Sequence, residues 1–158
     1  MSLKITSETF GDGKPIPVKY TADGSDVSPP LHFAGVPKQS AELALIVDDP
    51  DAPRAEPFVH WVIYKIPADV TDLPEGVPRD PTLKNPPGAL QGKNDFGKVG
   101  YGGPSPPRGH GTHHYHFHLY ALDTALEAKS GLDKKALLAS MSSHILDEGE
   151  LVGTYERK

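Results

Sequence analysis

The chain contains no cysteine among its 158 residues. Disulfide bonds, thiolate metal ligands and a cysteine nucleophile are therefore all excluded. No run approaches about 18 consecutive apolar residues, the length that a membrane-spanning helix needs. Residues 1–8 also lack the apolar segment of a secretory signal peptide. We therefore expect a cytoplasmic protein with no stable membrane insertion.

Positive charge is also scarce. Sixteen Lys and Arg residues stand against 21 Asp and Glu, which gives a formal net charge of −5. Because non-specific binding to nucleic acid depends on positive charge near phosphates, we expect no nucleic-acid partner. The chain also shows no P-loop ending in Gly-Lys-Ser or Gly-Lys-Thr and no Gly-x-Ser-x-Gly elbow, so we expect no cofactor.

Proline and glycine are abundant, with 17 and 16 residues, and they separate short apolar runs. These runs are rich in β-branched and aromatic residues, which predicts strands at 43–47, 58–64, 115–122 and 151–155. Helical spacing of apolar residues predicts one late helix around 132–146. The length suits a single domain, 1–158. The pattern is typical of a mainly β fold, a β-sandwich with one or two peripheral helices.

Two short segments combine strand signals with polar side chains. By strand alternation Asp49 shares a face with Leu43, Leu45 and Val47, so it stands at the rim of the core. The prolines of the Asp49-Pro50-Asp51-Ala52-Pro53 run stiffen the turn that aims it. An acidic surface turn would show the same residues. His60 lies inside an apolar strand, where alternation places it with Val62, and a structural core or edge histidine is the alternative.

The third segment, 100–115, is rich in glycine and proline and leads into a strand. Glycines allow a close backbone approach to a ligand, and their N–H groups can form a small anion nest. On the strand that follows, His113 and Tyr115 belong to the face that becomes apolar. The opposite face carries the stripe His114, His116 and His118. Alternate strand histidines can chelate zinc, and exposed histidines on a solvated face explain the stripe equally well.

These segments occur in an order that resembles the phosphatidylethanolamine-binding protein (PEBP) family, also called the Raf kinase inhibitor protein family, and in particular its small bacterial and archaeal branch. The resemblance rests on Ser28-Pro29-Pro30-Leu31, on 49–53, on His60-Trp61, on 100–107, on 113–123 and on 149–155. It implies a two-sheet antiparallel Greek-key β-sandwich with a small preformed pocket at one end. The ligand-binding residues that it implies are Asp49, Asp51, Pro53, His60, Gly100, Tyr101, Gly102, Gly103, Pro104, Pro106, His113 and Tyr115.

The resemblance implies non-enzymatic binding of a small anionic or zwitterionic group, such as phosphate, phosphorylethanolamine or a carboxylate, with a regulatory or inhibitor role. Two histidines beside Asp49 would offset the ligand's charge if partly protonated, so phosphate affinity should rise as the pH falls from 8 to 6. The alternatives are a weak hydrolase that uses the Asp and His side chains and a protease or kinase inhibitor that acts through its surface. No base at a fixed spacing supports Ser105 as a nucleophile. A homodimer is compatible with the resemblance.

Overall fold

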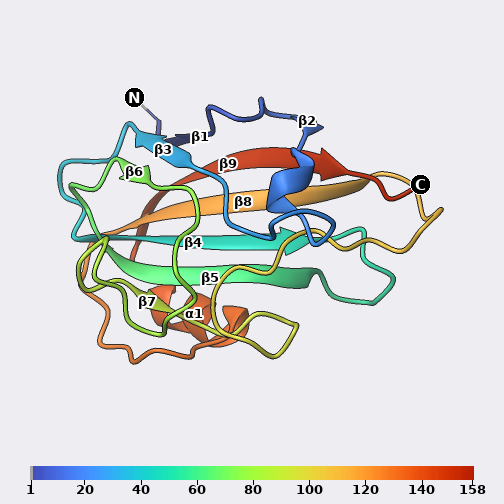
Figure 1. Ribbon diagram of the computed structural model, residues 1–158. Helices are drawn as coiled ribbons and strands as arrows, with labels where there is room; N and C mark the ends of the chain where they lie inside the picture. The colour runs from blue at the N-terminus through green and yellow to red at the C-terminus, as the bar shows by residue number, and fades with distance from the viewer. Residues whose placement is uncertain (1) are drawn as a thin grey trace.

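The computed structural model describes residues 2–158. Its larger sheet has six strands in the order β2-β9-β8-β4-β5-β7. Their bounds are β2 Lys14–Pro15, β4 Glu42–Asp49, β5 Phe58–Pro67, β7 Leu90–Gln91, β8 His113–Leu122 and β9 Ile145–Tyr155. A smaller sheet has three strands in the order β1-β3-β6, which are β1 Lys4–Thr6, β3 Leu31–Ala34 and β6 Asp72–Leu73. The chain crosses from β5 to β8 by a long connection and β8 then lies beside β4 (Figure 1).

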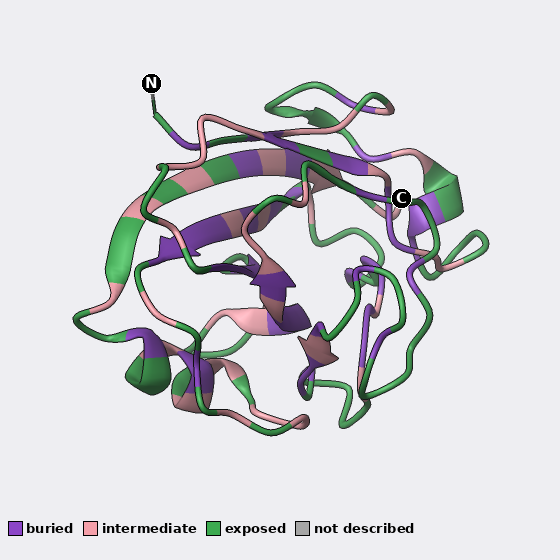
Figure 2. Ribbon diagram, turned by 90° about the vertical axis from the view of Figure 1, so that its left-hand side faces the viewer, coloured by how far each residue is buried: buried purple, intermediate pink, exposed green. Residues whose placement is uncertain are grey.

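The two faces of the larger sheet bury different side chains. One face packs against the smaller sheet in a cluster that includes Leu45, Trp61, Phe117 and Phe33. The other face packs against helix α1, Lys134–Met141, through residues such as Leu137. The buried strands in the middle of the molecule are surrounded by exposed loops (Figure 2). The predicted mainly β, two-sheet fold with a peripheral helix is confirmed.

Two details of the predicted fold are wrong. The helix expected over 132–146 spans only Lys134–Met141, because Ile145 pairs with Leu122 and begins β9. Residues from Ile145 onward therefore pair with β8, although their spacing would also fit a helix. The larger sheet is also not wholly antiparallel, because β2 lies parallel to β9. A short 3₁₀ helix, η1 Val18–Tyr20, was not predicted.

An irregularity in β5 decides where His60 points. β4 and β5 pair Val47 with Trp61 and then Asp48 with Val59, so His60 is the extra residue of a β-bulge. Because a bulge shifts strand alternation by one residue, Val59 joins the face that packs toward α1, while Trp61 stays in the core between the sheets. His60 is thereby turned to the side of Tyr115 rather than to that of Val62, where simple alternation placed it.

Candidate functional site

A cavity of about 310 Å³ opens where β4, β5 and β8 meet the turn after β4 and the proline-rich loop before β8. Three polar residues in its wall are almost completely buried: Asp49, His60 and His113 are 3%, 4% and 1% exposed as whole residues. Buried ionisable groups that converge in one hollow are typical of binding and catalytic sites. The full lining is Asp49, Ala52, Pro53, Arg54, Phe58, His60, Phe96, Ser105, Pro106, Pro107, His113 and Tyr115.

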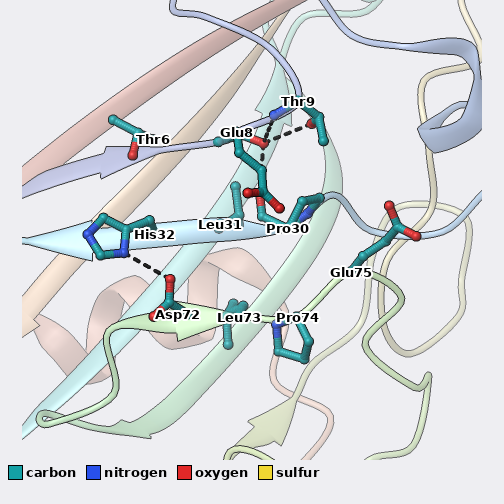
Figure 3. Close-up of a pocket in the computed structure, with 11 residues that line it drawn as sticks. Thr6, Glu8, Thr9, Pro30, Leu31, His32, Asp72, Leu73, Pro74 and Glu75 are labelled. Carbon is teal, nitrogen blue, oxygen red and sulfur yellow. Dashed lines mark hydrogen bonds and ion pairs between the residues drawn. The ribbon is translucent and has the colours of Figure 1, made fainter.

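A larger hollow lies elsewhere, against the smaller sheet (Figure 3). It has a volume of about 720 Å³ and lies over β3 and β6. Its ionisable pair, His32 and Asp72, is exposed to solvent at 54% and 63% of the side-chain area. Exposed ion pairs of this kind carry little energy. We therefore take the smaller cavity around Asp49 as the candidate site, because three buried ionisable groups converge there.

The carboxylate of Asp49 is fixed through both of its oxygens. Oδ1 accepts a hydrogen bond of 2.8 Å from the backbone N–H of Asp51, which closes the turn on itself. Oδ2 lies 2.6 Å from Nδ1 of His113, and the His113 ring donates there because a carboxylate only accepts. Asp49 therefore orients His113 and its own turn.

A third group extends this contact toward the surface. Nε2 of His113 lies 2.6 Å from Nδ1 of His110, an exposed residue of the loop before β8. The chain Asp49–His113–His110 thus runs from the buried end of the cavity to solvent. His110 was not predicted as a site residue, although its place three residues before His113 is a usable signal.

Asp51 holds the site together without lining it. Its Oδ2 accepts hydrogen bonds of 2.8 Å from both the backbone N–H and Nδ1 of His114. Desolvation is the largest single effect on the Asp51 carboxyl and raises its pKa. The hydrogen bonds and the charge of His114 together outweigh it, so the pKa is lowered. The hydrogen bonds fasten the turn after β4 to the beginning of β8. Asp51 was predicted as a ligand-binding residue, and its geometry is that of a brace.

His60 has a defined hydrogen-bonding role. Its Nδ1 donates to the carbonyl of Gly102 at 2.7 Å, and the Gly102 N–H donates back to the His60 carbonyl at 2.9 Å. The ring packs against Tyr115 and Phe96, with centroids 5.2 and 5.4 Å away. Burial lowers the pKa of His60 below its ordinary value, so the ring is neutral near pH 7. With Nδ1 occupied, Nε2 is the atom that it offers to a ligand, and this atom accepts a hydrogen bond.

The lowered pKa of His60 makes stability depend on pH. Below about pH 6.5 the unfolded chain binds a proton that the folded chain resists, so the free energy of unfolding should fall as the pH drops from 7 to 5. Each unit of pKa depression corresponds to about 1.4 kcal/mol. We expect urea unfolding of His60→Gln, which does not titrate, to lose less stability than the wild type over this range. Parallel pH profiles would contradict the assignment.

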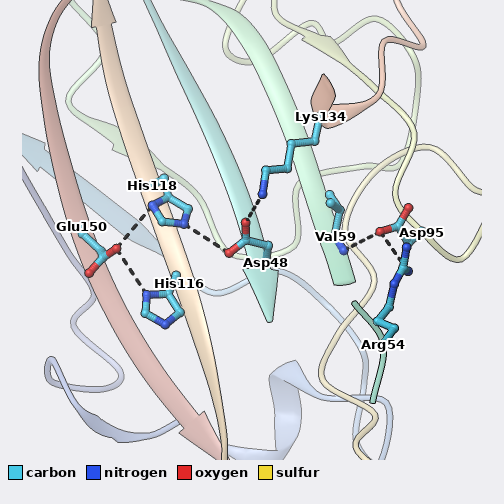
Figure 4. Close-up of polar contacts among 8 residues, drawn as sticks. All are labelled: Asp48, Arg54, Val59, Asp95, His116, His118, Lys134 and Glu150. Carbon is cyan, nitrogen blue, oxygen red and sulfur yellow. Dashed lines mark hydrogen bonds and ion pairs between the residues drawn. The ribbon is translucent and has the colours of Figure 1, made fainter. Parts of the chain in front are cut away.

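Two further side chains give the cavity donors and positive charge. Burial, aided by the nearby charge of Asp49, raises the pKa of Tyr115 far above its usual range, so its hydroxyl keeps its proton. Arg54 lies over the ring of Phe58, with Cζ 5.5 Å from the centroid, and bonds Asp95 at 3.3 Å (Figure 4). The polar end of the cavity is thus bordered by apolar rings and by one guanidinium.

The glycine-rich part of the loop does not form the anion nest that the sequence suggested. The N–H groups of Gly100, Gly102 and Gly103 donate to the Gly92 carbonyl, the His60 carbonyl and Asp26 Oδ1. These three donors are therefore not available to an anion. Gly103 is needed for close packing, because a Cβ there would lie 2.6 Å from the Tyr20 carbonyl oxygen.

Comparisons with known proteins identify the family of this chain. The family model described as phosphatidylethanolamine-binding protein matches residues 6–156. The chain belongs to the phosphatidylethanolamine-binding protein family. Among relatives of this PEBP chain, the UPF0098 protein of Pyrococcus horikoshii is 51% identical over 100% of this chain and 78% of its own length. The UPF0098 protein of Methanothermobacter thermautotrophicus is 47% identical over 98% of this chain and 99% of its own.

Solved structures place the PEBP chain in the same fold. Escherichia coli YbcL, described as a member of the mammalian PEBP family, superposes with a TM-score of 0.92 at 34% identity over 100% of both chains. A carboxypeptidase Y inhibitor, solved with its cognate proteinase, superposes with a TM-score of 0.52 at 16% identity over 99% of this chain and 83% of that one. The second likeness shows a shared fold only. Within residues 2–158 no helix of the PEBP chain has the length and apolar character needed to cross a bilayer.

The Asp49 cavity, the hollow of about 310 Å³ described above, is lined by half of the predicted site residues. Asp49, Pro53, His60, Pro106, His113 and Tyr115 line it. The residues that do not line it are Asp51, Gly100, Tyr101, Gly102, Gly103 and Pro104, of which Tyr101, Gly102 and Gly103 line a neighbouring hollow. The lining residues that were not predicted are Ala52, Arg54, Phe58, Phe96, Ser105 and Pro107. Most belong to or adjoin the predicted segments, whereas Phe96 lies in a stretch with only turn signals.

The predicted histidine stripe does not act as one group. Beside the Asp49 cavity, Nδ1 of His114 lies 2.8 Å from Oδ2 of Asp51. His116 and His118 turn instead to Glu150 on β9, at 3.2 and 3.3 Å. The stripe is thus divided, and His118 has a further acidic partner in Asp48, at 3.1 Å.

Proposed function

We propose that this protein binds, without turnover, a small phosphate- or carboxylate-bearing group in the Asp49 cavity, and that its preferred ligands also donate a hydrogen bond to His60. The observation that carries the proposal is the fixed orientation of both buried histidines, His60 by the Gly102 carbonyl and His113 by Asp49. Groups held in this way before a ligand arrives reduce the entropy lost on binding.

The polarity of the cavity favours one class of ligand. Neutral His60 accepts through Nε2, Tyr115 donates through its hydroxyl, and the guanidinium of Arg54, which also bonds Asp95, offers further donors at the wall. A protonated phosphate or an ammonium group can donate to His60, whereas acetate has no proton to donate near neutral pH. Phosphorylethanolamine satisfies these conditions together. We therefore expect it to bind more tightly than acetate.

Because the ligand donates its own proton to His60, its affinity should depend on pH. A phosphate monoester has a second pKa of about 6, so more of it carries a donor as the pH falls from 8 to 6. We expect phosphorylethanolamine affinity, measured by NMR titration, to rise over this range. The shifts should centre on Asp49, His60 and His113, which line the cavity.

Sulfate provides the control, because it has no group that titrates between pH 6 and 8. Its affinity should stay flat. If sulfate affinity rises as steeply, a histidine on the protein takes up the proton, as the sequence had suggested. If other residues shift while these three stay unchanged, the proposed cavity is not the ligand site.

Hydrolysis is the second candidate function, because Ser105 lines the cavity beside two histidines. Its Oγ accepts from Arg157 at 3.4 Å, and within residues 2–158 no hydrogen bond joins it to His60 or His113. A nucleophile needs such a bond to a base, so the geometry favours binding. Turnover of a generic phosphoester that disappears in His60→Ala would favour the enzyme. An inhibitor role, a cytoplasmic location and a homodimer remain predictions from the sequence.

A further inference from the structure

A second group of ionisable side chains lies on the face of β8 away from the cavity (Figure 4). His116 and His118 alternate along β8 and so point to the same side. On the neighbouring strand, β9, Glu150 is directly opposite His118 in the register. A residue opposite one histidine is diagonal to the other, and both positions are within reach of a glutamate side chain.

The two distances that join Glu150 to the histidines fit a metal ion better than they fit strong hydrogen bonds. Oε2 of Glu150 lies 3.2 Å from Nδ1 of His116 and 3.3 Å from Nδ1 of His118. Charge-assisted hydrogen bonds are shorter, about 2.7–2.9 Å. In a tetrahedral zinc site with bonds of about 2.0–2.2 Å, neighbouring ligand atoms are about 3.3–3.6 Å apart. All three donor atoms lie within 4.8 Å of one another.

A buried carboxylate orients one of these histidines. Nε2 of His118 lies 3.1 Å from Oδ1 of Asp48, whose other oxygen accepts from Lys134 Nζ at 2.6 Å. Asp48 is only 4% exposed. A carboxylate that accepts from one ring nitrogen leaves the other with a free lone pair, and metal-binding histidines almost always have such a partner. Asp48 therefore prepares Nδ1 of His118 as a ligand.

The surroundings are negative, as a cation requires. Besides Glu150, the carboxylate of Asp48 lies 3.1 Å from His118, and Glu148 stands two positions before Glu150 on β9. Lys134 forms an ion pair with Asp48, which offsets its positive charge. An arriving cation would therefore meet a net attractive field.

We propose that His116, His118 and Glu150 bind a divalent transition-metal ion such as Zn²⁺, with water completing the coordination. Two imidazoles and one carboxylate are a ligand set that zinc adopts. The site is distinct from the Asp49 cavity, because His113 and Tyr115 line that cavity from the other face of β8.

Calorimetry with Zn²⁺ on the tag-free chain tests the proposal. We expect one site per chain in the wild type, and at least a tenfold weaker site in His116→Ala and in Glu150→Gln. Glu150 is half exposed, so its substitution should leave the fold intact. His114→Ala is the matched control: it lies on the same face of β8 but pairs with Asp51, and it should bind like the wild type.

The outcomes separate the proposal from its alternatives. Zinc affinity that is unchanged in both His116→Ala and Glu150→Gln overturns it. Affinity lost in His113→Ala but kept in those two variants moves the ion to the cavity and also overturns it. Co²⁺ gives a second readout, since ligation by His116 and His118 should broaden their NMR signals in the wild type before those of His113 or His144. Uniform broadening would mean a non-specific ion.

Discussion

Replacing Asp49 by alanine is expected to lower the free energy of unfolding by about 2–5 kcal/mol. The substitution leaves Nδ1–H of His113 and the N–H of Asp51 without the acceptors they now have. The side chains of His113 and Asp49 are only 2% and 4% exposed, so water can replace the lost bonds only in part. Urea unfolding followed by tryptophan fluorescence measures the loss, because Trp61 is fully buried in the core.

The matched control is Asp72→Ala. It removes an Asp–His contact of similar geometry, 2.8 Å from Nδ1 of His32, whose side chains are 63% and 54% exposed. Because water solvates both groups when the contact is lost, we expect little change in stability. Equal losses of unfolding free energy in the two variants would show that burial of the Asp49–His113 contact adds nothing to stability.

The sequence was most informative where strands are regular. Alternation placed Asp49 on the core side of β4 and His113 on the core side of β8, and both line the cavity. The register between β4 and β8 runs without a shift from Glu42 to Asp48, so counting by two stays valid along it. Local pattern and global structure agree here, because each strand buries one face.

Strand alternation gave the wrong face for His60, because a β-bulge is defined by the pairing of two strands. The extra residue in β5 exists only relative to β4. His60 was still predicted as a site residue, but only through the family resemblance. The same reason explains the shortened helix, since Ile145 is drawn into β9 by its pairing with Leu122. The partner strands were predicted, but the residue-by-residue pairing between two strands cannot be read from either local sequence.

Contacts between distant segments account for the site residues that were missed. Phe96 reaches the cavity from a stretch of turns, where it packs on Phe58 with centroids 4.8 Å apart. The glycines mislead in the opposite direction. Gly102 and Gly103 suggest free amides, but the amides are bonded and the missing side chains serve packing. A glycine-rich loop thus predicts that another group lies close to its backbone, but not whether that group is a ligand or another segment of the protein.

Strand β8 contributes residues to both of the sites proposed above. Its odd-numbered residues, such as His113 and Tyr115, face the cavity and the core, while His116 and His118 face Glu150. The neighbouring carboxylates on β4 divide in the same way: Asp49 bonds His113, and Asp48 bonds His118. One pair of adjacent strands therefore positions an acidic residue under a histidine on each face of the sheet.

Replacing His60 by alanine is expected to weaken phosphorylethanolamine binding about 10- to 100-fold, the loss of one hydrogen bond to a charged group worth about 1.5–3 kcal/mol. The affected atom is Nε2, since Nδ1 is committed to the Gly102 carbonyl. Isothermal calorimetry at pH 6 measures the change, and His32→Ala, which removes an exposed histidine far from the cavity, should leave affinity unaltered. An affinity in His60→Ala equal to that of the wild type would contradict the role of His60 as acceptor. A loss that His60→Gln restores in part would support it, because the glutamine amide can still accept one hydrogen bond.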